Sequence, residues 1–248
     1  MINEVIRLYE PISLAEMSEV KLMNRIDTKF VTTVQKLALL LRMAKDAYWA
    51  QEIDGERNMA YDTTYFDTKD FDMYLQHLHG HTGRQKLRFR TYVSSGLQFM
   101  EVKTKNNHNR TKKKRMAVTD MNINDSDKRE FLHDHLRYDT GDLQPTLNNH
   151  FKRIILVNKA KTERLTIDTC LEFHNPLTGL DCEMGDLVII ELKRDGLCYS
   201  PVLEMLRQLA IHPHSFSKYC MGSALSNDHL AANRFKPKLA DIKKILMN

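Results

Sequence analysis

The first indication of the fold is the stretch Lys86-Leu87-Arg88-Phe89-Arg90, in which basic and apolar side chains alternate. A β-strand repeats every two residues, so Arg88 and Arg90 share one face while Phe89 points to the other. Taken alone, the pair could lie on a solvated strand face. Guanidinium groups also suit bidentate contacts with phosphate and keep their charge at any relevant pH, so the pair equally indicates an anion site.

The same two-residue spacing of charges recurs in three other strand-like stretches. They are Glu101-Val102-Lys103, the segment from Lys112 to Val118, and Ile189-Ile190-Glu191-Leu192-Lys193. Both signs of charge appear, and the opposite faces are mostly apolar. This pattern favours a sheet curled around a polar interior, in which cations hold a polyanion and carboxylates hold a metal.

Each of these stretches also has a simpler interpretation. Glu101 and Lys103 would form a surface ion pair on an exposed strand. The run from Asn109 to Arg115 is basic on both faces, so some of its charges are solvated, as in nonspecific or nuclear-localisation-like runs. Glu191 is expected deep in the sheet, where its carboxylate needs Lys193, an arginine or a metal ion as partner. Oxygen ligands together with phosphate favour Mg or Mn.

The composition limits the class of protein. The 248 residues are 42% hydrophobic and have a mean hydropathy of -0.48, values of an ordinary globular chain that fits one domain or two small ones. No apolar run approaches the roughly 20 residues that span a bilayer, and the first residues lack the apolar core of a signal peptide, so we expect a cytoplasmic protein. The cysteines show no C-x-x-C spacing and are expected as buried free thiols: Cys170, Cys182, Cys198 and Cys220.

The distribution of charge says more than its sum. A net charge of +5 is too small to indicate a nucleic-acid-binding protein, but basic residues cluster at 84–90, 103–115 and 152–164. Aromatic side chains that could stack bases are missing from the basic strands, so we expect no nucleic acid as partner. The sequence also lacks a G-x-x-x-x-G-K-[ST] loop and a G-x-S-x-G elbow, so side chains must bind any phosphate.

Periodicity predicts one domain of mostly antiparallel strands with a few helices. His77 to His81 reads as a loop and is not expected to bind a metal. Ser200-Pro201 and Ser217 are predicted helix starts, and residues 236–248 read as a basic tail. The predicted strands are 29–34, 61–66, 84–92, 97–104, 112–118, 151–157, 164–168 and 187–193, and the longer predicted helices are 35–48, 124–136 and 201–209.

The order of these motifs along the chain resembles the VTC domain, the polyphosphate polymerase domain of the triphosphate tunnel metalloenzyme superfamily. The resemblance covers residues from about 20 to 223. Each motif is short, and their specificity comes from their order. The matching stretches are Arg25-Ile-Asp-Thr-Lys29-Phe30, Tyr65-Phe66-Asp67-Thr68, Lys86-Leu-Arg88-Phe-Arg90, Glu101-Val-Lys103, Lys113-Lys-Arg115, His150-Phe-Lys-Arg153, Arg164-Leu-Thr-Ile-Asp168, Ile190-Glu191-Leu-Lys193 and Ser217-Lys218-Tyr219.

The resemblance implies an α+β fold: a closed antiparallel β-barrel, or tunnel, with flanking helices. Residues 1–248 would form a single domain, with 1–20 as an N-terminal capping segment and 228–248 as a basic tail. The implied activity is transfer of the γ-phosphate of ATP to a growing inorganic polyphosphate chain, with Mn or Mg as cofactor. The implied catalytic residues are Arg88, Arg90, Lys103 and Glu191, with Glu191 also the metal ligand. The implied phosphate-binding residues are Lys29, Lys113, Arg115, Arg153, Arg164, Lys193, Ser217 and Lys218.

The chain departs from the family pattern in three places. Superfamily hydrolases carry E-x-E-x-K on the first strand, whereas this chain has Arg25-x-Asp27-x-Lys29, which weakens a hydrolase interpretation. Ser215 stands where eukaryotic catalytic forms have a lysine. The chain shows neither the phosphate-sensing domain nor the membrane segments of the fungal complex. A triphosphatase of the same fold, and a noncatalytic polyphosphate- or nucleotide-binding module, remain as alternatives.

Overall fold

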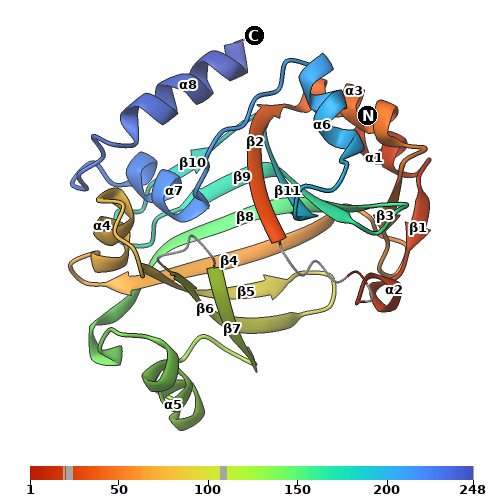
Figure 1. Cartoon of the computed structure of the whole chain (residues 1–248). Helices are drawn as coiled ribbons and strands as arrows, with labels where there is room; N and C mark the ends of the chain where they lie inside the picture. Colours follow the sequence, from red (N-terminus) through yellow and green to blue (C-terminus); the bar gives the residue numbers. More distant parts are fainter. Residues whose placement is uncertain (19, 21–24, 107–110, 248) are drawn as a thin grey trace.

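A computed structural model describes residues 1–18, 20, 25–106 and 111–247 (Figure 1). Asn109 and Arg110 of the predicted basic run lie outside these residues. The helices are α1 (Ile2–Ile6), α2 (Leu14–Ser18), α3 (Val34–Ala44), α4 (Asp72–Leu78), α5 (Ser126–His135), α6 (Pro201–Gln208), α7 (Lys218–Ser226) and α8 (Lys236–Met247), with a 3-10 turn at Thr140–Asp142. The strands are β1 (Glu10–Ile12), β2 (Arg25–Thr33), β3 (Tyr48–Gln51), β4 (Met59–Thr68), β5 (Gln85–Tyr92), β6 (Leu97–Lys105), β7 (Thr111–Val118), β8 (Leu143–Asn158), β9 (Glu163–His174), β10 (Asp181–Glu183) and β11 (Leu187–Asp195).

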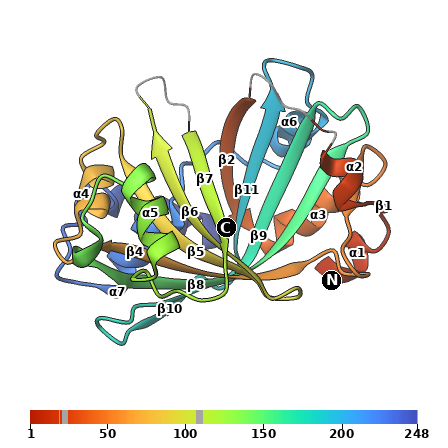
Figure 2. The same cartoon turned by 90° about the horizontal axis from the view of Figure 1, so that it is seen from below.

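The strands form one curved sheet whose main path runs β2-β11-β9-β8-β4-β5-β6-β7 with antiparallel neighbours. The α+β class and the antiparallel sheet are as predicted, but the predicted closure of the barrel is wrong. Among the described residues, β2 and β7 are the ends of the path, and Figure 2 shows them on the two sides of an open seam. Strand β7 carries Lys112, Lys113, Lys114 and Arg115 on both of its faces, and such charge is typical of an edge strand that does not pair further.

The convex face of the sheet is covered by helices. Thr33 caps the N-terminus of α3, its hydroxyl accepting a hydrogen bond from the backbone N–H of Lys36 (3.4 Å). The apolar side of α3 packs with α6 against β2 and β11, where Phe30, Ile190 and Leu192 are buried. Helix α5 covers the other end, over Leu87 and Val102 of β5 and β6. The convex side is therefore apolar, and the charged side chains that alternate with these residues point into the curve.

Helix α7 lies on the concave face and fills one end of it. A Cβ atom on Gly222 would come within 2.5 Å of the Phe173 ring and 2.7 Å of the Leu147 side chain, so glycine is required for this close approach. Ser217, the predicted helix start, is the N-cap of α7 and accepts a hydrogen bond from the backbone N–H of Cys220 (3.2 Å). Residues 236–247, expected as part of a basic tail, form helix α8, which buries Ile242 in the same apolar cluster.

Three smaller expectations need correction. His77 belongs to α4, so the predicted loop begins only after Leu78. Cys220 is buried as expected, whereas Cys170 and Cys198 are exposed, and the four thiols are free. Strand β8 begins at residue 143 rather than 151, and the side chain of Ser200, although at the predicted start of α6, makes no capping hydrogen bond. Within the described residues, none of the helices has the length and apolar character needed to cross a membrane.

Candidate phosphate-binding site

The charged residues of the predicted motifs share the concave face of the sheet. Cross-strand partners of an antiparallel sheet point to the same side, so the register assigns whole rows of side chains to one face. Glu191 of β11 and Lys103 of β6 belong to the strands next to the two ends of the path, yet each shifts the pKa of the other, because the sheet curls and brings them together. The rows are Asp27–Lys193–Arg164, Lys29–Glu191–Thr166, Arg88–Glu101–Arg115 and Lys86–Lys103–Lys113.

Glu101 is a buried carboxylate held between two cations. The Arg88 Nε atom donates to its Oε2 atom at 2.6 Å, and the Lys113 Nζ atom donates to Oε1 at 2.9 Å. Burial acts to raise the pKa of Glu101, but Arg88 and Arg90 outweigh it and hold that pKa well below its usual range. Glu101 is therefore a permanent anion that orders Arg88, and the alternative of a surface ion pair with Lys103 is wrong because Glu101 is 1% exposed.

Arg90 is buried without a carboxylate partner among the described residues. Its Nε atom donates to the Thr63 hydroxyl at 3.2 Å, and its guanidinium carbon lies 5.6 Å from the ring centroids of both Tyr61 and Phe151. Burial, followed by repulsion from Arg88 and Arg153, lowers the pKa of Arg90 to about 10, so the side chain stays protonated near neutral pH. Aromatic rings hold this cation in place without neutralising it, and its charge remains available to an anion.

Asp168 is the second buried carboxylate that binds two cations. Arg153 donates to it through Nε (2.5 Å) and a second guanidinium nitrogen (2.7 Å), and the Lys218 Nζ atom donates to the same carboxylate. The two cations hold the pKa of Asp168 well below its usual range even though burial acts to raise it. Lys218 also lies 3.8 Å from the Phe151 ring centroid, and burial lowers its pKa to about 7 although Asp168 acts in the opposite direction.

Glu191 has a weaker partner than the other two carboxylates. The Lys193 Nζ atom lies 3.4 Å from its Oε2 atom, and the Glu191 side chain is 25% exposed, so one carboxylate face is accessible. Burial acts to raise its pKa, but Lys193, Lys29 and more distant cations lower the value to about 2. The predicted Lys193 partner is found, whereas Glu191 is half-buried rather than deep, and its carboxylate is ionised at every physiological pH.

The family model of the VTC domain matches residues 24–227. The chain belongs to the VTC domain family. Its fold is shared with an adenylate cyclase candidate from Bacillus halodurans, at 14% identity over 79% of this chain and 96% of that chain, with a TM-score of 0.51. An adenylyl cyclase candidate from Hippeastrum, described as having a dominant triphosphatase activity, is similar at 14% identity over 82% and 96% of the two chains, with a TM-score of 0.53. No curated protein matches the sequence.

Glu191 is the residue of this VTC domain that could take part in binding a divalent metal. Among the residues that the structure describes, no group of three or more His, Cys, Asp or Glu side chains is arranged to hold a metal ion. Glu101 and Asp168 are already paired with two cations each, which leaves Glu191 with an accessible carboxylate. Mg²⁺ is commonly bound by one or two carboxylates together with substrate phosphates and water, so the donor set fits an ion that arrives with a phosphate chain.

The other predicted phosphate ligands lie at different depths of the VTC domain. The Lys29 Nζ atom donates to the Phe216 carbonyl at 2.8 Å, and Lys103 is half-buried with its pKa well below the usual range because of burial. Arg164 is half-buried, and its Nε atom finds no hydrogen-bond partner among the described residues. Arg115 is exposed and lies 4.8 Å from the Phe99 ring centroid, while Lys113 is 41% exposed, so both belong to the edge of the site.

Two residues at the centre of the site were not predicted as ligands. Asp168 ends one of the matched motifs, and the β8–β9 register pairs it directly with Arg153, but its contact with Lys218 depends on where α7 packs. Lys86 opens another motif, and its Nζ atom donates to the Ser217 hydroxyl at 2.8 Å. The two-residue period of the strand already placed Lys86 on the same face as Arg88, and this period was the feature of the sequence that could have identified Lys86. Ser215, which replaces a family lysine, is exposed.

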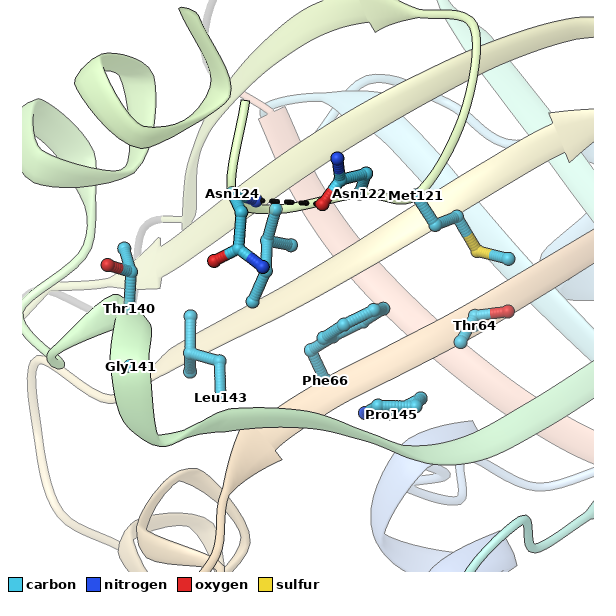
Figure 3. Close-up of a pocket in the computed structure, with 10 residues that line it drawn as sticks. Thr64, Phe66, Met121, Asn122, Asn124, Thr140, Gly141, Leu143 and Pro145 are labelled. Atoms are coloured by element: carbon cyan, nitrogen blue, oxygen red, sulfur yellow. Dashed lines mark hydrogen bonds between the residues drawn. The ribbon is translucent and has the colours of Figure 1, made fainter. Parts of the chain in front are cut away.

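A pocket of about 420 Å³ lies on the opposite face of the sheet (Figure 3). Thr64 and Phe66 of β4 line it, and these residues alternate with Thr63 and Tyr65 of the concave face. The remaining lining residues are 121–124, Thr140, Gly141, Leu143 and Pro145. The Asn122 side chain accepts a hydrogen bond from the Asn124 backbone N–H (3.2 Å). None of the lining side chains is charged, so this pocket lacks the cations that a phosphate site needs.

Proposed function

We propose that this chain is a polyphosphate polymerase that transfers the γ-phosphate of ATP to a growing inorganic polyphosphate chain, with Mn²⁺ or Mg²⁺. The observation that carries the proposal is the unequal pairing of charges on the concave face. Glu101 and Asp168 order Arg88 and Arg153, while Arg90 and Lys103 have no carboxylate within ion-pair distance in the described part of the chain. Arg90 keeps its positive charge near neutral pH with no carboxylate to neutralise it, which suits a polyanion.

Phosphoryl transfer depends on positioning and charge neutralisation more than on covalent chemistry by the protein. The terminal oxygen of a polyphosphate is already an anionic nucleophile, so no general base is needed. It forms a bond to the γ-phosphorus as the bond from that phosphorus to its bridging oxygen breaks, and ADP leaves with the electron pair. Arg88, Arg90 and Lys103 would stabilise the charge that develops on the transferred group.

The remaining residues would guide the donor and the product. A divalent ion held by Glu191, when bound, would neutralise charge on the phosphate oxygens. Lys29, Arg153 and Lys218 would orient the donor or the chain end, since they lie around the N-terminus of α7. Contacts with more distant phosphates would come from Lys113, Arg115, Arg164, Lys193 and Ser217.

The alternative activity is hydrolysis of tripolyphosphate or nucleoside triphosphates, and it is favoured by the triphosphatase activity of the Hippeastrum protein. Against it, β2 offers only Asp27 where hydrolases have two carboxylates, and Asp27 is paired with Arg25 at 2.7 Å. Purified protein incubated with ATP and Mn²⁺ or Mg²⁺ should form chains that are visible on a gel. Orthophosphate as the only product would refute the polymerase, and the absence of any turnover would leave a binding module.

A further inference from the structure

Four basic side chains gather beside the N-cap of α7, next to the site described above. Within the described residues, none of these four side chains forms an ion pair with a carboxylate, whereas Arg88 and Arg153 do. Of the four, only Lys29 belongs to the predicted phosphate ligands. We call this group the second basic cluster; its members are Lys29, Arg84, Lys86 and Lys105.

The polar partners of the cluster are neutral. Lys86 donates to the Ser217 hydroxyl and Lys29 to the Phe216 carbonyl, each at 2.8 Å. The backbone N–H of Lys105 donates to the Arg84 carbonyl at 3.0 Å, which aligns these two residues at the end of the β5–β6 ladder. Neutral partners orient the cations without cancelling their charge, so the cluster is built to receive an anion.

The cations of the cluster repel one another. Burial lowers the pKa of Lys86, Cys220 and Tyr65 act in the opposite direction, and Lys29 and Arg84 lower it further. Burial also lowers the pKa of Lys105, followed by repulsion from Arg84 and Lys29. Cations brought together in this way destabilise one another until a counter-charge is present, and a phosphate chain supplies one with several oxygens.

The second basic cluster continues the row of charges that begins at Arg88 and Arg90. The three side chains of Arg84, Lys86 and Arg88 lie two residues apart, so they point to the same face; Arg84 directly precedes β5. Lys86 is the cross-strand partner of Lys103. At about 3.3 Å per residue, Arg84 lies roughly 13 Å along the strand from Arg88. A triphosphate that is bound at Arg88 and Arg90 therefore does not occupy the second basic cluster, which remains available to phosphates further along the same chain.

We propose that Arg84, Lys86 and Lys105 of the second basic cluster form a subsite that binds the continuation of an inorganic polyphosphate chain and gives the site a preference for long chains. This inference rests on the proposed function, because it assumes that the Arg88 region holds a triphosphate end. Arg84, Lys86 and Lys105 are thereby specificity-determining residues for chain length, acting on phosphates away from the reacting atoms.

The test compares affinities for two probes, tripolyphosphate and size-fractionated long-chain polyphosphate, at fixed salt and without ATP. The Arg84→Ala/Lys105→Ala variant should lose about tenfold in the ratio of long-chain to tripolyphosphate affinity. The matched control is Lys112→Ala/Lys114→Ala, which removes the same charge from exposed positions on the outer face of β7. The control should keep the parent ratio, and thermal unfolding of both variants checks that they fold.

An unchanged ratio in the Arg84→Ala/Lys105→Ala variant would overturn the subsite, and so would an equal change in the control. A variant that fails to fold is replaced by the single variants Arg84→Gln and Lys105→Gln, judged by the same ratio. Because binding is measured without turnover, the result is independent of the polymerase assay. A parent protein that makes no polyphosphate but shows the predicted change in ratio would refute the proposed function and retain the subsite.

Discussion

The Tyr219 hydroxyl donates a hydrogen bond to the buried carboxylate of Asp67 and thereby ties helix α7 to the first turn of α4. Asp67 also accepts hydrogen bonds from the backbone N–H groups of Met73 and Tyr74, both at 2.9 Å. Helix α7 begins directly after Ser217 and carries Lys218 in its first turn. The position of Ser217 and Lys218, two residues of the proposed phosphate site, is thus fixed by a contact outside that site.

Replacing Tyr219 by phenylalanine removes this hydrogen bond and leaves a buried carboxylate with one donor fewer. We expect the free energy of unfolding to fall by about 1–3 kcal/mol, the usual cost of an unsatisfied buried polar group. Urea unfolding measures the change, with Tyr199→Phe as control because Tyr199 is 81% exposed. Equal stability of the two variants would show that the contact does not hold α7.

Replacing Glu191 by glutamine should separate binding from turnover. Removal of a negative charge from a basic surface should make tripolyphosphate bind several-fold more tightly in buffer that contains a chelator. Metal-dependent turnover of ATP should fall by at least about 100-fold, as for the loss of one strong transition-state contact. Titration calorimetry and a phosphate-transfer assay measure the two effects. Weaker tripolyphosphate binding without metal would contradict the assigned position of Glu191.

Replacing Asp168 by asparagine leaves Arg153 and Lys218 without their shared anion. We expect a loss of about 3 kcal/mol in the free energy of unfolding near pH 7. The pKa of Asp168 is depressed in the folded state, so its contribution is present above the unfolded value of about 3.9 and declines as pH falls below it. The difference in stability between parent and variant should therefore shrink in acid, and a constant difference from pH 7 to pH 3 would refute the ion-pair explanation.

The pKa of Lys218, lowered to about 7 mainly by burial, predicts a pH-dependent contribution to phosphate binding. The side chain is charged below this pH and loses its charge above it, so its contribution should decline from pH 6 to pH 8. In a Lys218→Arg variant the side chain stays charged, and the ratio of variant to parent affinity for tripolyphosphate should rise with pH. Taking the ratio cancels the ionisation of the ligand itself, and a ratio independent of pH would contradict the prediction.

The sequence predicted most strands, the principal helices and the face on which the charges lie. The prediction succeeded at Arg88, Arg90 and Glu191 because the two-residue period of a strand is a local property. It failed for the residues at 236–247, whose helix is stabilised by burying Ile242 against distant strands rather than by a strong local pattern. The predicted burial of the cysteines also failed, because Cys170 lies at an exposed position of β9 and Cys198 lies in the segment that follows β11.

The sequence by itself determined that Arg88 and Arg90 point away from the apolar core and that the chain is a VTC domain. Only the tertiary structure decided which cations keep a free charge. Asp168 meets Arg153 and Lys218 from three separate elements, and Glu101 meets Arg88 and Lys113 across two strand pairs. The tertiary structure also decided that, within the described residues, β2 and β7 do not pair with each other. Alternation along a strand is fixed by backbone geometry, whereas ion pairing and closure depend on register and curvature, which arise only when distant strands meet.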